Sequence, residues 1–147
     1  MGREICYTDT GGKGTVSRKQ GAVSSKKPHR NLTAWQKAME LVVAIYNVTK
    51  EFPKEEIYGL TSQLRRAAIS VPSNIAEGAA DRTTQQFSNF LSNAIGSLNE
   101  IETQLDLVLR LGYLAENDYH HLHEMLDECL ALTYGLRKSL KRSNSEQ

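Results

Sequence analysis

Apolar residues recur at intervals of three and four along most of the chain after residue 31, which is the spacing of one face of an α-helix. Four segments show this spacing, and none alternates as a half-buried strand would. The last two segments keep a heptad rhythm, through Phe87, Leu91, Ala94, Leu98, Ile101, Leu105 and Val108 and through Tyr119, Leu122, Leu126, Cys129, Thr133, Leu136 and Leu140. The pattern predicts an all-α protein with four helices.

The first two helices have wider apolar stripes. We expect the first to start after Leu32, with Thr33 and Gln36 at the spacing of a capping box, and to end before Pro53. Its stripe follows Leu32, Trp35, Met39, Val42, Tyr46 and Thr49 and is widened by Ala38, Leu41, Ile45 and Phe52; the second helix carries Leu60, Leu64, Ala67, Ala68, Val71 and Ile75. Stripes of this width suit a bundle core.

Three short links separate the four helices, at residues 53–59, 79–82 and 111–115. Links of this length join neighbours that run antiparallel. We therefore predict an up-down-up-down antiparallel four-helix bundle over residues 31–142. A disordered basic tail is expected at residues 1–30, because this stretch is rich in Gly, Ser and Lys and poor in apolar residues, and a disordered C-terminal end at residues 143–147.

Pro72 falls inside the second predicted helix and removes the hydrogen bond to the Ala68 carbonyl. Two outcomes are open. The helix can continue with a kink, helped by polar groups of Ser70, Ser73 and Asn74, or it can break in two with Ser70 as the new cap.

Residues 67–99 span parts of two helices and contain only three charged residues, Glu77, Asp81 and Arg82. A helix without a charged face is usually covered, and uncharged polar groups are far less costly to bury than ions. We therefore predict self-association through the second and third helices, with an interface formed by Gln63, Arg66, Ser70, Ser73, Asn74, Glu77, Gly78, Asn89, Asn93 and Ser97. The alternative is a neutral face that stays in water.

Composition narrows the class further. Hydrophobic residues make up 39% and charged residues 24%, and no window approaches the apolar length of a membrane span, so we expect a soluble protein without a membrane partner. The start of the chain supports neither a secretion signal nor a lipid anchor, and two cysteines are too few for a disulfide framework. A cytoplasmic location is expected.

The segments EIYGLTSQLRRAAISVPSNIAEGAADRT, FLSNAIGSLNEIETQL and LGYL resemble the four-helix-bundle proteins encoded within intervening sequences of large (23S) ribosomal RNA genes. The broader superfamily includes the accessory variability determinant of diversity-generating retroelements. The resemblance implies a homopentameric barrel and, for the retroelement branch, a reverse transcriptase and nucleic acid as partners. The family's characteristic polar positions correspond to Gln63, Arg65, Arg66, Ser73, Asn74, Glu77, Gly78, Arg82, Gly96, Ser97, Glu102 and Gln104.

Candidate chemistry is sparse. A di-iron bundle needs Glu-x-x-His pairs, and no Glu here is followed three residues later by His. His120, His121 and His123 point in different directions around the fourth helix, so only His120 with Glu124 or with His123 could share a ligand. Glu102 and Asp106 lie one turn apart, and we expect a structural ion pair with Arg65 or Arg66. The sequence predicts no enzyme activity, no cofactor, no metal and no small-molecule substrate.

Charge is unevenly distributed along the chain. Residues 1–30 hold seven Lys or Arg against two acidic residues, whereas the rest holds eleven against fifteen. In an up-down bundle one end gathers the basic residues Lys26, Lys27, Arg30, Arg82, Arg137, Lys138, Lys141 and Arg142, and the other gathers Glu51, Glu55, Glu56, Glu116 and Asp118. We predict that the basic end contacts RNA or DNA. The alternatives are that these cations complement the dipole of the last helix, and that the protein is a self-assembling scaffold without nucleic-acid contact.

Overall fold

The computed structural model describes residues 27–81 and 83–145, and these residues form helices joined by short links. In chain order the elements are the 3-10 helix η1 (Pro28–Asn31), α2 (Thr33–Thr49), the 3-10 helix η2 (Lys54–Glu56), α3 (Leu60–Ala79), α4 (Thr84–Arg110) and α5 (Glu116–Ser145). The described residues contain no strand, and the all-α, four-helix prediction is confirmed.

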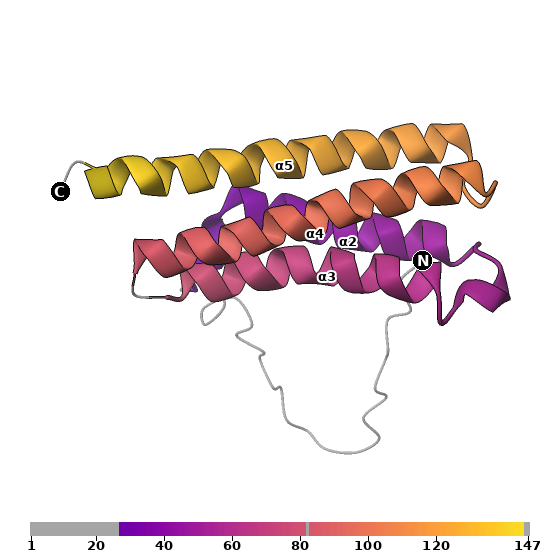
Figure 1. The fold of residues 1–147 in the computed structure, drawn as a ribbon, viewed down its shortest axis with the longest axis horizontal. Helices are drawn as coiled ribbons and strands as arrows, with labels where there is room; N and C mark the ends of the chain where they lie inside the picture. The colour runs from indigo at the N-terminus through magenta and orange to yellow at the C-terminus, as the bar shows by residue number, and fades with distance from the viewer. Residues whose placement is uncertain (1–26, 82, 146–147) are drawn as a thin grey trace, which may run out of the picture.

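The four long helices lie side by side along the long axis of the molecule (Figure 1). Following the colour of the chain, each runs opposite to the one before it, so the bundle is up-down-up-down. Each helix packs on its two neighbours in the order α2, α3, α4, α5, and α5 closes the bundle against α2. This is the arrangement expected of short connections.

The core contains most of the heptad positions of α4 and α5, while Phe87, Tyr119, Leu136 and Leu140 are half-buried at its border. Leu91, Leu98, Ile101, Leu105 and Val108 of α4 are fully buried, and so are Leu122 and Leu126 of α5. From α3 the core takes Leu64, Ala67, Ala68, Val71 and Ile75, as the apolar spacing predicted.

In the apolar stripe expected for the first helix, the residues that widen it are buried, whereas most of its central line lies too far toward α3. The buried residues of α2 are Ala34, Ala38, Leu41, Ile45 and Thr49. Trp35, Val42 and Tyr46 are only half-buried, and Met39 is 41% exposed. The apolar face of α2 is wider than the area that α3 and α5 cover, so the residues at one edge of this face remain partly exposed.

Both ends of α4 carry standard capping interactions. Thr83 caps α4 by accepting a hydrogen bond from the Gln86 N–H at 3.2 Å. Gly112 ends α4 with φ +76°, and the Tyr113 N–H bonds the Val108 carbonyl at 2.9 Å, as in a Schellman motif.

The predicted capping box at Thr33 does not form. Leu32 takes the cap position, and the Gln36 amide instead donates to the Arg30 carbonyl at 2.8 Å. This bond ties α2 to η1, because the 3-10 turn brings that carbonyl within reach of the first helical turn.

Pro72 lies in an unbroken helix and is itself buried. Of the two outcomes left open, the helix therefore continues, and Ser70 is not a cap. The Asn74 amide donates to the Ser70 carbonyl at 2.8 Å and to its hydroxyl at 3.0 Å, which adds polar contacts one turn around the proline.

Helix α5 continues to Ser145, so the expectation of a disordered end from residue 143 is wrong for residues 143–145. Asn144 explains part of this extension, because its carbonyl oxygen accepts a hydrogen bond from the Thr84 hydroxyl at 2.6 Å. The predicted tail lies outside the described residues, except for residues 27–30.

Candidate functional site

The predicted interface residues lie along the outer surface of α3 and α4, which we call the α3–α4 face. Gln63, Arg66, Ser73, Glu77, Asn89 and Asn93 are exposed, whereas Ser70, Asn74 and Ser97 are half-buried. Most of the predicted interface residues are therefore not buried within one chain.

A polar groove runs between α3 and α4 on this face. It has a volume of about 490 Å³ and is lined by Gln63, Arg66, Ala67, Ser70, Ser97 and Glu100. The hydroxyls of Ser70 and Ser97 are 2.8 Å apart and bridge the two helices at its floor. Close to it, Gln104 donates to Glu100 at 3.2 Å, while its own carbonyl oxygen is buried without a partner among the described residues.

Gly78 belongs to the interior rather than to this face. A Cβ built on it would lie 2.7 Å from Cδ2 of Phe87 and 2.8 Å from Cβ of Phe90. The missing side chain thus admits α4 of the same chain, which corrects its predicted place at the contact between subunits.

An apolar surface lies on the opposite flank of α3, and sequence reasoning missed it. This α2–α3 groove has a volume of about 300 Å³ and is lined by Trp35, Met39, Val42, Ile69, Pro72, Ser73 and Ala76. Beside it Val43 is 58% exposed. The signal was present, because Val43 and Ile69 are apolar positions outside the buried stripes of their helices.

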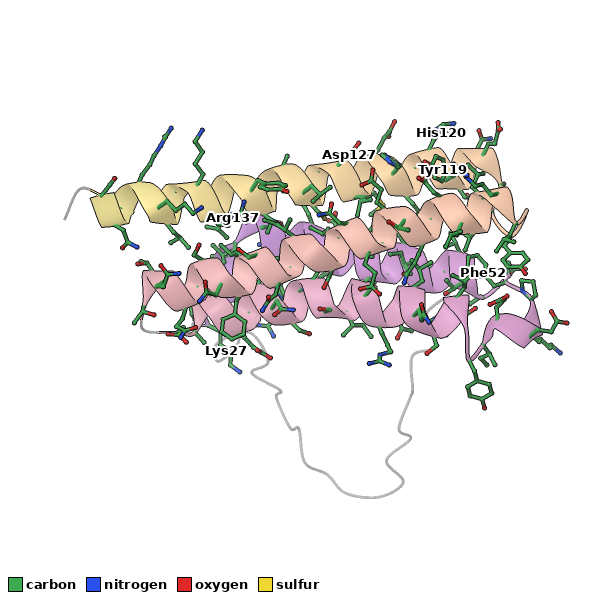
Figure 2. The ribbon with its side chains drawn as sticks, in the orientation of Figure 1. Lys27, Phe52, Tyr119, His120, Asp127 and Arg137 are labelled. Atoms are coloured by element: carbon green, nitrogen blue, oxygen red, sulfur yellow. The ribbon has the colours of Figure 1, made fainter. Side chains whose placement is uncertain are left out.

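The described basic residues lie at the end of the bundle predicted for them. Figure 2 shows Lys27 and Arg137 in one half of the rod, and Phe52, Tyr119 and His120 in the other. Lys27, Arg30, Lys138, Lys141 and Arg142 are exposed, whereas Arg137 is half-buried and donates to the Ser92 hydroxyl at 3.2 Å. Lys26 and Arg82 lie outside the described residues. We call the described set the basic end.

Aromatic rings accompany these cations. The Arg30 guanidinium lies 5.6 Å from the centre of the Trp35 ring, and the Arg137 guanidinium 5.0 Å from that of Tyr134. His29 packs on Trp35 with ring centres 5.0 Å apart. Burial, and then the charges of Arg30 and Lys27, lowers the pKa of His29.

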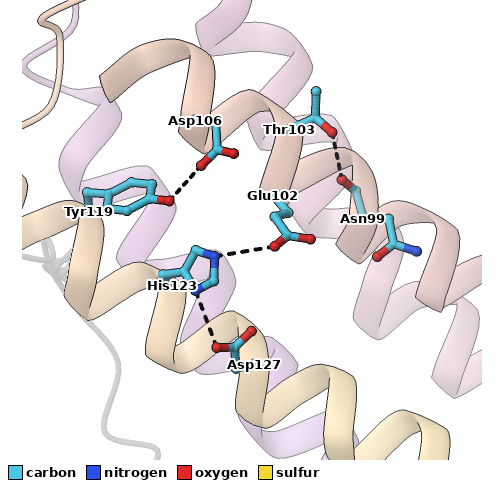
Figure 3. Close-up of polar contacts among 7 residues, drawn as sticks. All are labelled: Asn99, Glu102, Thr103, Asp106, Tyr119, His123 and Asp127. Atoms are coloured by element: carbon cyan, nitrogen blue, oxygen red, sulfur yellow. Dashed lines mark hydrogen bonds and ion pairs between the residues drawn. The ribbon is translucent and has the colours of Figure 1, made fainter. Parts of the chain in front are cut away.

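Figure 3 shows the polar contacts between α4 and α5. The Tyr119 hydroxyl donates to Asp106 at 2.6 Å, and His123 lies 3.3 Å from both Glu102 and Asp127. The carboxylates on α4 therefore pair with α5, and the predicted ion pair with Arg65 or Arg66 is wrong. Arg65 instead donates to the Thr49 hydroxyl at 2.8 Å and covers the Tyr46 ring.

The histidines of α5 do not assemble a metal site. Among residues 27–81 and 83–145, no three His, Cys, Asp or Glu residues are placed to hold an ion together. His123 directs one ring nitrogen at Glu102 and the other at Asp127, so the two carboxylates contact different atoms of the ring (Figure 3). The contacts of Tyr119 and His123 with Asp106 and Glu102 instead join α5 to α4.

The fold and the candidate surfaces on the outside of its helices define the class: this is an antiparallel four-helix-bundle protein. None of the described helices is both long enough and apolar enough to cross a membrane. The sequence model of the family described as 23S rRNA-intervening sequence protein matches residues 30–135. The chain belongs to this family.

A solved structure supports the assignment of the fold. The crystal structure of a protein of unknown function from the S23 ribosomal protein family of Bacteroides thetaiotaomicron is 26% identical to this chain. Its TM-score is 0.67, and the match covers 71% of this chain and 95% of the other. A search of curated proteins found no match.

Proposed function

We propose that this protein is a non-enzymatic, homo-oligomeric bundle that binds RNA or DNA through its basic end. The observation that carries the proposal is the gathering of exposed lysines and arginines at one end of the rod, together with the Trp35 and Tyr134 rings. Cations bind phosphates, and aromatic faces accept bases, so the two together favour nucleic acid over an acidic protein.

Self-association is the second part of the proposal. The α3–α4 face offers a polar groove, and the α2–α3 groove on the opposite flank of α3 offers exposed apolar residues. A ring of parallel subunits would bring several basic ends together and strengthen their combined field. The resemblance to the accessory variability determinant favours a homopentamer, with a reverse transcriptase as a protein partner.

Binding of a fluorescent, structured RNA at several salt concentrations tests the nucleic-acid contact. We expect affinity to fall steeply from low to moderate salt and to be lost in Lys138→Glu/Lys141→Glu. Lys50→Glu/Lys54→Glu changes charge equally at the other end, where both side chains are exposed, and should retain most of the affinity. Indifference of the wild type to RNA at low salt would contradict the proposal.

A self-assembling scaffold without nucleic-acid contact is the alternative, and the apolar α2–α3 groove is the observation that favours it. The RNA-binding experiment separates the two functions, because a scaffold of this kind does not bind the RNA. Native mass spectrometry of protein purified from its own host reports the number of subunits and any bound nucleic acid or reverse transcriptase together.

A further inference from the structure

The outer surface of α5 carries a hollow formed by residues that lie outside the buried core. It has a volume of about 300 Å³ and is lined by Tyr134, Gly135, Arg137, Lys138 and Lys141. Tyr134 keeps 45% of its surface exposed. An aromatic ring with cations around it and an open floor is a surface on which a flat ligand can stack.

Gly135 forms part of the floor of this hollow. It lies inside a long helix, where glycine costs about 0.5–1 kcal/mol relative to alanine. A Cβ built there would meet no described atom within 4 Å, so no neighbour in the bundle requires its absence. Gly78 differs, because α4 occupies the space that its side chain would take. Gly96 of α4 is also exposed with open space around it, so the absent side chain of Gly135 matters because it leaves the hollow open beside the Tyr134 ring.

Arg137 fixes the ring in place. Its guanidinium lies 5.0 Å from the centre of the Tyr134 ring and donates to the Ser92 hydroxyl of α4 at 3.2 Å. These two contacts hold the ring and the guanidinium together against α4. Lys138 and Lys141 are exposed at the border of the same hollow and remain available to anions.

We infer that this hollow binds an unpaired nucleobase, which stacks on Tyr134 above Gly135 while Lys138 and Lys141 contact the flanking phosphates. The inference rests on the proposed function and narrows it to single-stranded nucleic acid or to unpaired bases of a structured one. A duplex keeps its bases stacked inside the helix, so it can use the lysines but not the ring.

The test measures affinity by fluorescence anisotropy for three probes of equal length: a single-stranded oligonucleotide, its abasic analogue and a duplex. Ribose and deoxyribose versions of the first probe distinguish RNA from DNA. For wild type we expect the single strand to bind about tenfold more tightly than the abasic analogue. Tyr134→Leu should remove this advantage and leave duplex binding unchanged, whereas Tyr134→Phe should keep it, because the phenyl ring still stacks.

Two further variants complete the design. Gly135→Gln fills the floor and should weaken single-strand binding about as much as Tyr134→Leu. Tyr58→Leu is the matched control, because Tyr58 is 94% exposed in the link between α2 and α3, and it should bind like wild type. Circular dichroism checks that each variant keeps its helices.

The outcomes separate the inference from the proposed function. Equal binding of the single strand by Tyr134→Leu and wild type, with loss in Lys138→Glu/Lys141→Glu, overturns the base site and leaves nucleic-acid binding standing. If no probe binds to the wild type at low salt, both fail.

Discussion

At the scale of single residues, two helical glycines in this protein have opposite roles. Gly78 is buried, and its absent side chain is what lets Phe87 and Phe90 of α4 approach α3. Gly135 is exposed, and its absent side chain leaves open space. The residue type is the same, so only the surroundings tell the two roles apart.

Gly78→Ala should destabilise the protein by about 1–3 kcal/mol, because the new methyl group overlaps Phe87 and the Cβ of Phe90, which is fixed to its helix. Gly135→Ala is the matched control and should stabilise it by about 0.5–1 kcal/mol through helix propensity. Denaturant unfolding followed by circular dichroism measures both changes. Equal effects of the two substitutions would contradict the close packing at Gly78.

Cys129 should be chemically silent in the native protein. Burial, and then the nearby Glu128 carboxylate, raises the pKa of its thiol to about 12, and the side chain is 1% exposed. The reactive thiolate is therefore scarce at neutral pH. In a Cys6→Ser background, a thiol reagent at pH 8 should modify Cys129 only after denaturant is added. Rapid modification of the folded protein would refute this assignment.

At the scale of elements, polar contacts join α5 to both of its neighbours, α4 and α2. The Tyr119 hydroxyl bonds Asp106 of α4, and Lys37 of α2 lies 3.8 Å from Glu128 of α5. At the end of the bundle where α2 and α4 finish, the Phe52 and Tyr113 rings of the two links pack with centres 6.0 Å apart. The two polar contacts position α5 over α4 and α2.

Tyr119→Phe should lower the free energy of unfolding by about 1–2 kcal/mol, because Asp106 loses its donor. The hydrogen bond to Asp106, and then burial, raises the pKa of Tyr119 above its usual 10.0. A raised pKa means that the native state retains the proton, so this stabilisation is complete below pH 10 and is lost as pH rises further.

The free energy of unfolding of the wild type should therefore fall more steeply above pH 10 than that of Tyr119→Phe. Tyr113, whose pKa is raised mainly by burial, contributes to both curves and cancels in the comparison. Denaturant unfolding at pH 8 to 11 measures the difference. Parallel curves would mean that Tyr119 does not depend on Asp106 in the folded protein.

At the scale of the whole molecule, copies of the chain can meet on the α3–α4 face or on the α2–α3 groove, and mutations distinguish the two contacts. If copies meet on the α3–α4 face, Asn89→Glu/Asn93→Glu places charges in the contact and should reduce the mass in solution toward the single chain of 16.4 kDa. Asn117→Glu is a matched control on an exposed residue of α5. Light scattering at micromolar concentration measures the mass.

Met39→Gln/Ile69→Gln tests the α2–α3 groove by the same measurement. Both side chains are more than 40% exposed, so the fold should tolerate the change. A loss of mass here and none in Asn89→Glu/Asn93→Glu would place the contact on the apolar flank instead. If the wild-type protein has the mass of a single chain in this measurement, the proposed self-association is wrong.

The sequence determined the number of helices, their approximate bounds and the heptad core of α4 and α5. These follow from local chemistry, because periodicity, the Thr83 cap and Gly112 act within one or two turns. The sequence also placed the basic residues at one end, since short links leave little choice of topology.

Only the tertiary structure decided which part of a wide apolar arc is buried. It put Met39 at the surface, gave Gly78 to the interior of one chain, and paired Asp106 with Tyr119 rather than with an arginine. Each outcome depends on the rotation of one helix against its neighbour. Periodicity along a single helix carries no information about that rotation, which the packing of side chains between helices sets.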